Sequence, residues 1–235
     1  MERPPPGAGR RPSPALALVG RDADVAAVSA LLAEPDVRLV TLTGVGGVGK
    51  TRLARVLAEA GGDAFPDGTL FVPLAPVQDP AHVVSAIGRA LGTGEQGDRL
   101  LLDAIVAELR GLAMLLVLDN FEHLMSAATL VAEILDRCPA LRVLATSRSS
   151  LRLSGEREYP VEPLALPAAD GRLTAAELAG VPAVELFVAR ARMAAPGFRL
   201  DDHNAAAVAA ICSRLDGVPL ALQLAAAGVK MLSPV

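Results

Sequence analysis

A glycine-rich segment that ends in lysine and threonine gives this sequence its clearest chemical signal. Residues 44–51 fit the G-x-x-x-x-G-K-[ST] pattern of a phosphate-binding loop. Glycines let successive backbone N–H groups converge on an oxyanion, and the N-terminus of the following helix adds positive potential. Lys50 can reach the β- and γ-phosphates, and the Thr51 hydroxyl can ligate Mg²⁺. A turn that happens to end in Lys-Thr is the alternative.

An acidic residue closes an apolar run further along the chain. The run 115–118 followed by Asp119 has the form of a buried strand, expected next to the strand before the phosphate loop, that delivers a carboxylate from its carboxyl end. There it could hold Mg²⁺ together with Thr51, whereas an N-cap role for a helix at Phe121 is the alternative. The next residue, Asn120, cannot accept a proton, so the sequence predicts a good nucleotide binder that hydrolyses slowly.

Two further charged residues could act on a bound triphosphate. Glu122 could reach the site, although a first-turn glutamate favoured by the helix dipole explains it equally well. Arg148 ends the segment 144–148, where it could contact a γ-phosphate; a solvated surface arginine is the alternative. His123 and His203 are expected to be surface or capping residues, and no cluster has metal-ligand spacing.

The composition narrows the possible classes of protein. The 235 residues are 52% hydrophobic, and a net charge of −4 argues against a general nucleic-acid-binding surface. Cys138 and Cys212 are too isolated for a disulfide framework or a metal site, so both are expected in the core. The longest apolar run, 112–118, is too short to cross a membrane, and no signal peptide is present. A cytoplasmic protein is expected.

Alternating strand-like and helical segments must position these groups. Their order predicts an α/β fold of the three-layer P-loop NTPase type, with helices on both faces of a parallel sheet. The expected strands are 38–43, 69–74, 113–118, 141–146 and a shorter one around 159–161. The expected helices are 25–32 with Asp22 as N-cap, one after the phosphate loop, one from 79–80, 99–109 and roughly 121–137, with 92–97 as a loop.

The pattern changes to helices alone after Pro167, which predicts a small all-helical subdomain. Pro219 occupies the first-turn position that proline prefers in a helix. The apolar stripes of the two preceding helices are Val184, Phe187, Val188 and Ala191, and Val208, Ile211, Cys212 and Leu215. The predicted organisation is a disordered leader at 1–14, a P-loop nucleotide-binding domain at 15–164 and a helical subdomain at 165–235.

Five motifs in this order resemble the STAND class of P-loop ATPases, close to the NB-ARC type. The branch is the one found in large bacterial transcriptional activators, LuxR-like and antibiotic-regulator-like. The motifs are Val19-Gly20-Arg21, Gly44 to Thr51, Leu115-Asp119-Asn120 with Glu122-His123-Leu124, Thr146-Ser147-Arg148, and Gly217-Val218-Pro219-Leu220. The last has Val218 where the family's G-L-P-L motif has leucine.

The resemblance implies roles in binding ATP or ADP with Mg²⁺. Val19 and Arg21 would border the adenine and ribose, and Pro219 would pack on the adenine. The alternative is that Pro219 is simply a helix N1 proline, and both can hold together. The expected nucleotide contacts are Val19, Arg21, Gly44, Gly46, Gly47, Val48, Gly49, Lys50, Thr51, Arg52 and Pro219. The residues expected to act on the phosphates are Lys50, Asp119, Glu122 and the sensor Arg148, and the Mg²⁺ ligands are Thr51 and Asp119.

Three functions are compatible with these residues. A nucleotide-dependent switch of a signal-transducing regulator, closed with ADP and self-associating with ATP, fits best. A housekeeping ATPase is the alternative, against which Asn120 argues, and intact Lys50 and Asp119 argue against a scaffold that no longer binds nucleotide. The family's winged-helix, repeat and DNA-binding domains are absent from the 235 residues. The expected partners are therefore adenine nucleotide and domains of a longer protein, without direct DNA binding.

Overall fold

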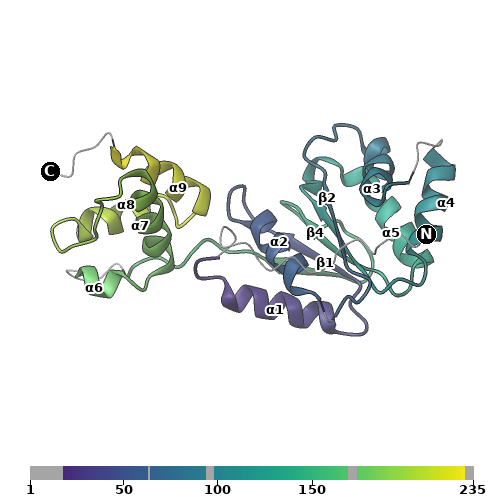
Figure 1. The fold of residues 1–235 in the computed structure, drawn as a ribbon, viewed down its shortest axis with the longest axis horizontal. Coiled ribbons are helices and arrows are strands. Elements are labelled where there is room, and N and C mark those ends of the chain that lie inside the picture. Colours follow the sequence, from purple (N-terminus) through teal and green to yellow (C-terminus); the bar gives the residue numbers. More distant parts are fainter. Residues whose placement is uncertain (1–17, 63, 94–97, 169–173, 231–235) are drawn as a thin grey trace, which may run out of the picture. The chain divides into compact units, whose positions relative to one another are not determined.

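Five short strands pair into one parallel sheet (Figure 1). The computed structural model describes residues 18–62, 64–93, 98–168 and 174–230; the expected leader at 1–14 lies outside this part, as do residues 94–97 of the expected loop. The sheet order is β2-β3-β4-β1-β5, and every neighbouring pair is parallel. The strand that ends in Asp119 is therefore not next to the strand before the phosphate loop, as was expected, because β4 lies between the two. The strands are β1 Leu39–Thr43, β2 Thr69–Pro73, β3 Leu115–Asp119, β4 Arg142–Thr146 and β5 Glu156–Pro160. The predicted α/β fold with a parallel sheet is confirmed.

Residue contacts divide the described chain into two units. The sheet unit consists of residues 23–44 and 50–160, and the helical unit consists of 18–22, 45–49 and 161–230. Each unit buries its own set of apolar side chains. Residues 45–49 of the phosphate loop are therefore part of the helical unit, whereas Gly44, Lys50 and Thr51 are part of the sheet unit.

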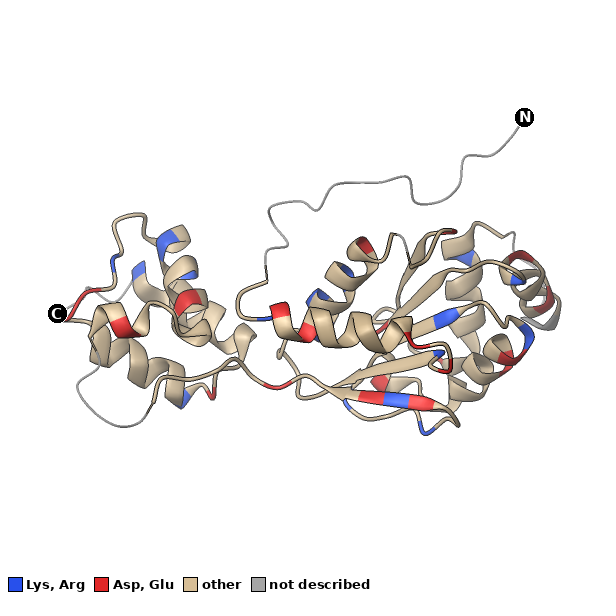
Figure 2. Ribbon diagram, turned by 90° about the horizontal axis from the view of Figure 1, so that it is seen from below, with Lys and Arg blue, Asp and Glu red and all other residues tan. Residues whose placement is uncertain are grey.

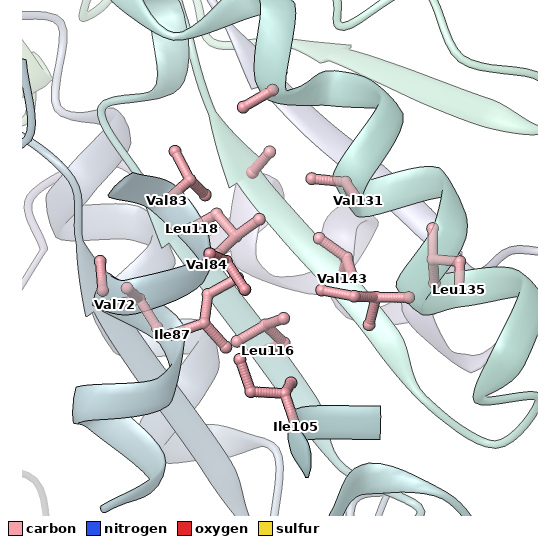
Figure 3. Packing of buried hydrophobic residues seen from close by; sticks show 14 of the residues in the cluster. Val72, Val83, Val84, Ile87, Ile105, Leu116, Leu118, Val131, Leu135 and Val143 are labelled. Atoms are coloured by element: carbon pink, nitrogen blue, oxygen red, sulfur yellow. The ribbon is translucent and has the colours of Figure 1, made fainter. Parts of the chain in front are cut away.

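Helices cover both faces of the sheet because its interior strands bury side chains on both sides. All five residues of β3 are buried. Leu116 and Leu118 pack in a cluster with Val83, Ile105 and Val131 from three helices (Figure 3). The alternate residues of β3 point to the opposite face, where α2 packs against four of the strands. The helices of this unit are α1 Asp22–Ala33, α2 Lys50–Ala60, α3 Val83–Leu91, α4 Asp98–Leu109 and α5 Ala128–Arg137, with the short 3-10 turn η2 Pro80–His82.

The segment after β3 differs from the predicted single helix over 121–137. Two 3-10 turns, η3 Phe121–His123 and η4 Met125–Ala127, precede α5. Phe121 and Leu124 are both fully buried, and their spacing of three residues suits a 3-10 turn, in which such positions share one side. Burial of these two side chains therefore determines the local conformation.

Two boundaries also differ from the sequence-based expectation. Helix α1 begins at Asp22 itself, so Asp22 is not the predicted N-cap residue; an aspartate in the first turn is favoured by the helix dipole. Strand β5 has five residues, as many as the other strands. It lies at the edge of the sheet, where Pro160 is tolerated. Its charged residues Glu156, Arg157 and Glu158 discourage pairing with another strand; Figure 2 colours acidic residues red and basic residues blue.

The helical unit confirms the predicted change to helices after Pro167, within the residues described. It contains α6 Ala175–Leu178, α7 Pro182–Ala194, α8 Ala205–Arg214, α9 Pro219–Ala227 and the 3-10 turn η5 Gly228–Lys230. The predicted stripe on α7 is buried, as are Val208 and Cys212 of the stripe on α8. Pro219 is the first residue of α9, as predicted. Among the described residues, no helix has the length and apolarity that a membrane span needs.

Candidate nucleotide site

The phosphate loop connects β1 to α2, which begins at Lys50. Gly44, Gly47 and Gly49 have φ angles of 136°, 79° and 108°, a region that other residues rarely adopt. Lys50 is only 9% exposed. Its Nζ donates a hydrogen bond of 2.7 Å to the Gly44 carbonyl oxygen, which holds the ammonium group at the start of the loop. The glycines and the lysine thus meet the geometric needs of the predicted loop.

Asp119, at the end of β3, lies beside Thr51, the second residue of α2. Thr51 Oγ1 donates a hydrogen bond of 2.7 Å to Asp119 Oδ1, although the two residues are 68 positions apart. Asp119 is 7% exposed and belongs to the strand itself. The N-cap residue of the following turn is Asn120, which rules out the capping alternative for Asp119. The predicted pair of Mg²⁺ ligands is therefore assembled within the sheet unit.

A second hydroxyl, from Thr146, reaches the same carboxylate oxygen. Thr146 is the last residue of β4, and its Oγ1 donates to Asp119 Oδ1 at 2.6 Å. The same hydroxyl accepts the Asn120 N–H at 2.8 Å. Asn120 has φ 70° and ψ 51°, a left-handed conformation that asparagine tolerates better than most residues. Thr146 thus holds both the acid and the strained residue after it.

Sequence reasoning gave Thr146 no role of its own. It appeared only as part of the segment that ends in Arg148. The signal that could have identified it is a hydroxyl at the carboxyl end of a buried strand. In a parallel sheet, that position lies beside the carboxyl end of the neighbouring strand, which here carries the acid.

Two of the residues expected to act on phosphates form an ion pair. Arg148 Nε lies 3.1 Å from Glu122 Oε1, with the Arg148 side chain 69% exposed and that of Glu122 18% exposed. Burial lowers the pKa of Lys50, the carboxylates of Glu122 and Asp119 oppose this change, and the Arg148 guanidinium adds to it. Because Glu122, Asp119 and Arg148 all act on the Lys50 ammonium, the four residues predicted to act on phosphates lie close together in the sheet unit.

The middle of the phosphate loop makes its contacts within the helical unit. Arg21 is 6% exposed, and its Nη2 donates to the Val48 carbonyl at 3.0 Å and to the Glu162 carbonyl at 2.7 Å. The Gly47 carbonyl accepts the Leu220 N–H at 3.1 Å. A Cβ atom at Gly47 would approach Leu220 Cβ to 2.8 Å, so only glycine fits there. Arg21 and α9 therefore both contact the loop backbone.

The other expected nucleotide contacts are more open. Val19 packs, partly buried, against the core of the helical unit. Pro219 and Arg52 are half-buried, and Gly46 is exposed. Their roles toward adenine, ribose and phosphate remain predictions from the resemblance.

Histidine and cysteine have structural positions. His123 is exposed, and one of its ring nitrogens, Nε2, lies 2.6 Å from the Val77 carbonyl oxygen. His203 is also exposed. Cys138 and Cys212 are free and buried, which confirms that both are core residues. Across the described ranges, no group of three or more His, Cys, Asp or Glu side chains could hold a metal ion.

The donor set at Thr51 and Asp119 fits Mg²⁺. A hydroxyl oxygen and a carboxylate oxygen, 2.7 Å apart, are ligands of the kind this hard cation prefers. Mg²⁺ commonly binds through one or two protein oxygens and the phosphates of a substrate, rather than in a cage made of protein alone.

Curated relatives of this chain include regulators of much greater length. A protein of Mycobacterium tuberculosis strain H37Rv, whose name describes a candidate HTH-type transcriptional regulator, is 45% identical over 206 residues. That match covers 87% of this chain and 21% of the relative. The regulatory protein AfsR of Streptomyces griseus is 34% identical over 140 residues, which are 55% of this chain and 14% of AfsR. The chain thus spans about a fifth or less of these relatives.

Solved structures share the fold at low sequence identity. Drosophila ORC bound to DNA aligns with a TM-score of 0.59 at 16% identity, over 90% of this chain and 61% of that one. The Aeropyrum pernix ORC2 protein, solved as ADPNP–ADP complexes, aligns with a TM-score of 0.53 at 17% identity and the same two coverages. Residues 36–158, more than half of the chain, match the family described as AAA domain. This chain belongs to the AAA domain family of P-loop NTPases, whose fold implies nucleotide binding.

Proposed function

We propose that this chain is the adenine-nucleotide switch module of a larger transcriptional regulator. The observation that carries the proposal is the assembly of Lys50, Thr51 and Asp119 at the phosphate loop, with Thr51 and Asp119 joined at 2.7 Å. The relatives named as regulators support the transcriptional context, because they match 87% and 55% of this chain. The chain would bind ATP and ADP, and other domains of the longer protein would read the result.

The residues of the site divide the work on a bound triphosphate. The loop N–H groups and the Lys50 ammonium would bind the β- and γ-phosphates. Thr51 and Asp119 would hold Mg²⁺, which when bound neutralises negative charge on the phosphate oxygens. Asn120 offers no base next to Asp119, so we expect slow hydrolysis.

A switch needs a group that distinguishes ATP from ADP. A ligand shifts a conformational equilibrium only through different affinities for the two states. The Arg148 guanidinium is the candidate, because it lies near Lys50 and can form charged hydrogen bonds with a γ-phosphate. ATP would then favour a state that self-associates or contacts partner domains, and ADP would favour the resting state.

A housekeeping ATPase is the second candidate. The half-buried Glu122 carboxylate favours it, since a carboxylate near the phosphates could accept a proton from water. Steady-state turnover separates the two functions. A rate near 10 s⁻¹, about the median for enzymes, would favour the ATPase over the switch.

The switch proposal is tested by removing the lysine charge. Lys50→Ala should lower the affinity for ADP and for a non-hydrolysable ATP analogue by at least about a hundredfold. The reason is that charged hydrogen bonds to phosphate are each worth about 1.5–3 kcal/mol and the Coulomb attraction adds to them. Isothermal titration calorimetry with Mg²⁺ measures both affinities. Lys230→Ala is the matched control, because Lys230 is the only other lysine in the sequence and is exposed on η5. Equal affinities in Lys50→Ala and the parent chain would disprove nucleotide binding at the loop.

A further inference from the structure

The ion pair of Glu122 and Arg148 lies close in sequence to Asp119, one of the two expected Mg²⁺ ligands, and to Thr146, which binds it. Glu122 lies three positions after Asp119, and Arg148 lies two positions after Thr146. The Asp119 and Thr146 side chains are themselves joined by a hydrogen bond of 2.6 Å. The ion pair therefore lies next to the place where the γ-phosphate of a bound nucleotide would be coordinated, if the proposed function is correct.

The two partners differ in their freedom to move. The Arg148 side chain is 69% exposed, whereas that of Glu122 is 18% exposed. Glu122 belongs to η3, a turn fixed on one side by Phe121, which is fully buried. Arginine has a long, flexible side chain, so Arg148 can turn to another partner while Glu122 stays in place.

Only one of the two Glu122 carboxylate oxygens has a hydrogen-bond partner among the described residues. Glu122 Oε1 accepts the Arg148 Nε–H, whereas Oε2 is buried and has no such partner. An unpaired buried oxygen is costly, and a carboxylate at this position gains most from a positive charge nearby. Among the described residues, the Arg148 guanidinium makes no hydrogen bond other than the one to Glu122.

We propose that Glu122 and the γ-phosphate compete for Arg148, so that Glu122 makes ATP binding weaker relative to ADP binding. This inference rests on the proposed function. A γ-phosphate gains the Arg148 contact only by ending the Arg148–Glu122 pair, and it then faces the released carboxylate. ADP has no γ-phosphate and leaves the pair intact. Glu122 would thus bias the switch toward its ADP state and set the ATP level needed to change it.

A double-mutant cycle tests the competition. Glu122→Gln keeps the shape and an acceptor oxygen but removes the charge. It should raise the affinity for a non-hydrolysable ATP analogue about threefold to tenfold more than the affinity for ADP, the size expected for a half-exposed charged pair. In an Arg148→Ala background, which should itself weaken only ATP binding, Glu122→Gln should still favour the ATP analogue over ADP, because the carboxylate faces the γ-phosphate, but by a clearly smaller factor than with Arg148 present. Calorimetry on the 235-residue chain with Mg²⁺ provides the affinities.

The matched control is Glu133→Gln, because Glu133 forms an ion pair of the same kind with Arg137 on α5, at 3.2 Å. It should change neither affinity. Melting temperatures identify misfolded variants, and Glu122→Ala replaces Glu122→Gln if the latter does not fold.

Two results would overturn the competition. An equal gain for both nucleotides with Arg148 present would mean that Glu122 acts only through its charge. A loss of ATP affinity in Glu122→Gln would mean that Glu122 assists binding. If the parent chain binds both nucleotides through Lys50 and either result is found, this inference fails alone. If no nucleotide binds, the proposed function fails with it.

Discussion

At the scale of single residues, one carboxylate oxygen connects three elements of the sheet unit. Asp119 Oδ1 accepts hydrogen bonds from Thr51 at the start of α2 and from Thr146 at the end of β4. Two hydroxyl donors on one oxygen fix the orientation of the carboxylate. The Asn120 N–H, bound to the Thr146 hydroxyl, extends this network to the residue that follows the acid.

Asn120→Asp should raise the rate of ATP hydrolysis about tenfold or more while changing ATP affinity by less than about threefold. The reason is that a carboxylate next to Asp119 can accept a proton from water, and well-placed general bases contribute about 10²–10⁴-fold. Aspartate also tolerates the left-handed conformation at this position, so the backbone should be preserved. Phosphate release under saturating ATP measures the rate.

Asn120→Gly is the control, because glycine adopts the same backbone conformation and adds no carboxylate. It should leave the hydrolysis rate close to that of the parent chain. If both variants increase turnover equally, the backbone and not a base limits hydrolysis, and the reasoning about Asn120 is incorrect.

Some of these residues could be predicted from sequence and others could not. The proximity of Lys50, Thr51 and Asp119 could be predicted, because a phosphate loop and an acid that ends a buried strand meet at the carboxyl edge of a parallel sheet. The pairing of Glu122 with Arg148 depends on a side-chain orientation after a 3-10 turn. Sequence periodicity contains no information about that orientation.

At the scale of secondary structure, strands with apolar runs were the most predictable elements. Strands β1 to β4 lie within one or two residues of their predicted bounds, because continuous apolar runs are typical of buried strands. The prediction of a helix over 121–127 was wrong, since the apolar spacing there fits a helix and a pair of 3-10 turns equally well. Tertiary burial of Phe121 and Leu124 decided between them. The length of β5 was missed because an edge strand rich in charge has no apolar run.

Two buried threonines on strands of the sheet offer a matched test of what a hydroxyl contributes. Thr41 on β1 is fully buried, and its Oγ1 has no hydrogen-bond partner in the described chain. Thr41→Val should therefore stabilise the fold by about 1 kcal/mol, since a buried polar atom without a partner is costly. Thr146→Val should destabilise it by about 1–3 kcal/mol, because the Asn120 N–H would lose its acceptor.

Urea unfolding followed by circular dichroism measures both changes. Valine has the same shape as threonine and suits a strand, so packing is nearly constant in the two variants. Thr146→Ser, which keeps the hydroxyl, should recover most of the loss. Changes of the same sign in both valine variants would show that hydrogen bonding does not decide the stability at these positions.

At the scale of the whole chain, the two units have separate cores, and each core contains one cysteine. Cys138 belongs to the core of the sheet unit and Cys212 to that of the helical unit. Burial raises the pKa of the Cys212 thiol to about 11, and burial also raises the pKa of the Cys138 thiol. Each thiol therefore resists losing its proton only while its own unit is folded.

This resistance predicts a loss of stability at alkaline pH. The ordinary pKa of a thiol is 9.0, so from about pH 9 to pH 11 the unfolded chain releases the Cys212 proton while the folded chain retains it. The unfolded state then binds fewer protons, and the free energy of unfolding falls as the pH rises. Below about pH 8, both states keep the proton, and this contribution does not vary. Cys212→Ala removes the titrating group and should reduce the decline in melting temperature between pH 8 and pH 10.5.

All other titratable groups are present both in the parent chain and in the variant, so the difference between the two isolates Cys212. Cys138→Ala is the matched comparison for the sheet unit. If the two units unfold separately, each variant should alter the pH dependence of one calorimetric transition and leave the other unchanged. If they unfold as one, both variants should alter a single transition. A decline with pH in Cys212→Ala that equals the decline in the parent chain would show that water reaches this thiol in the folded state.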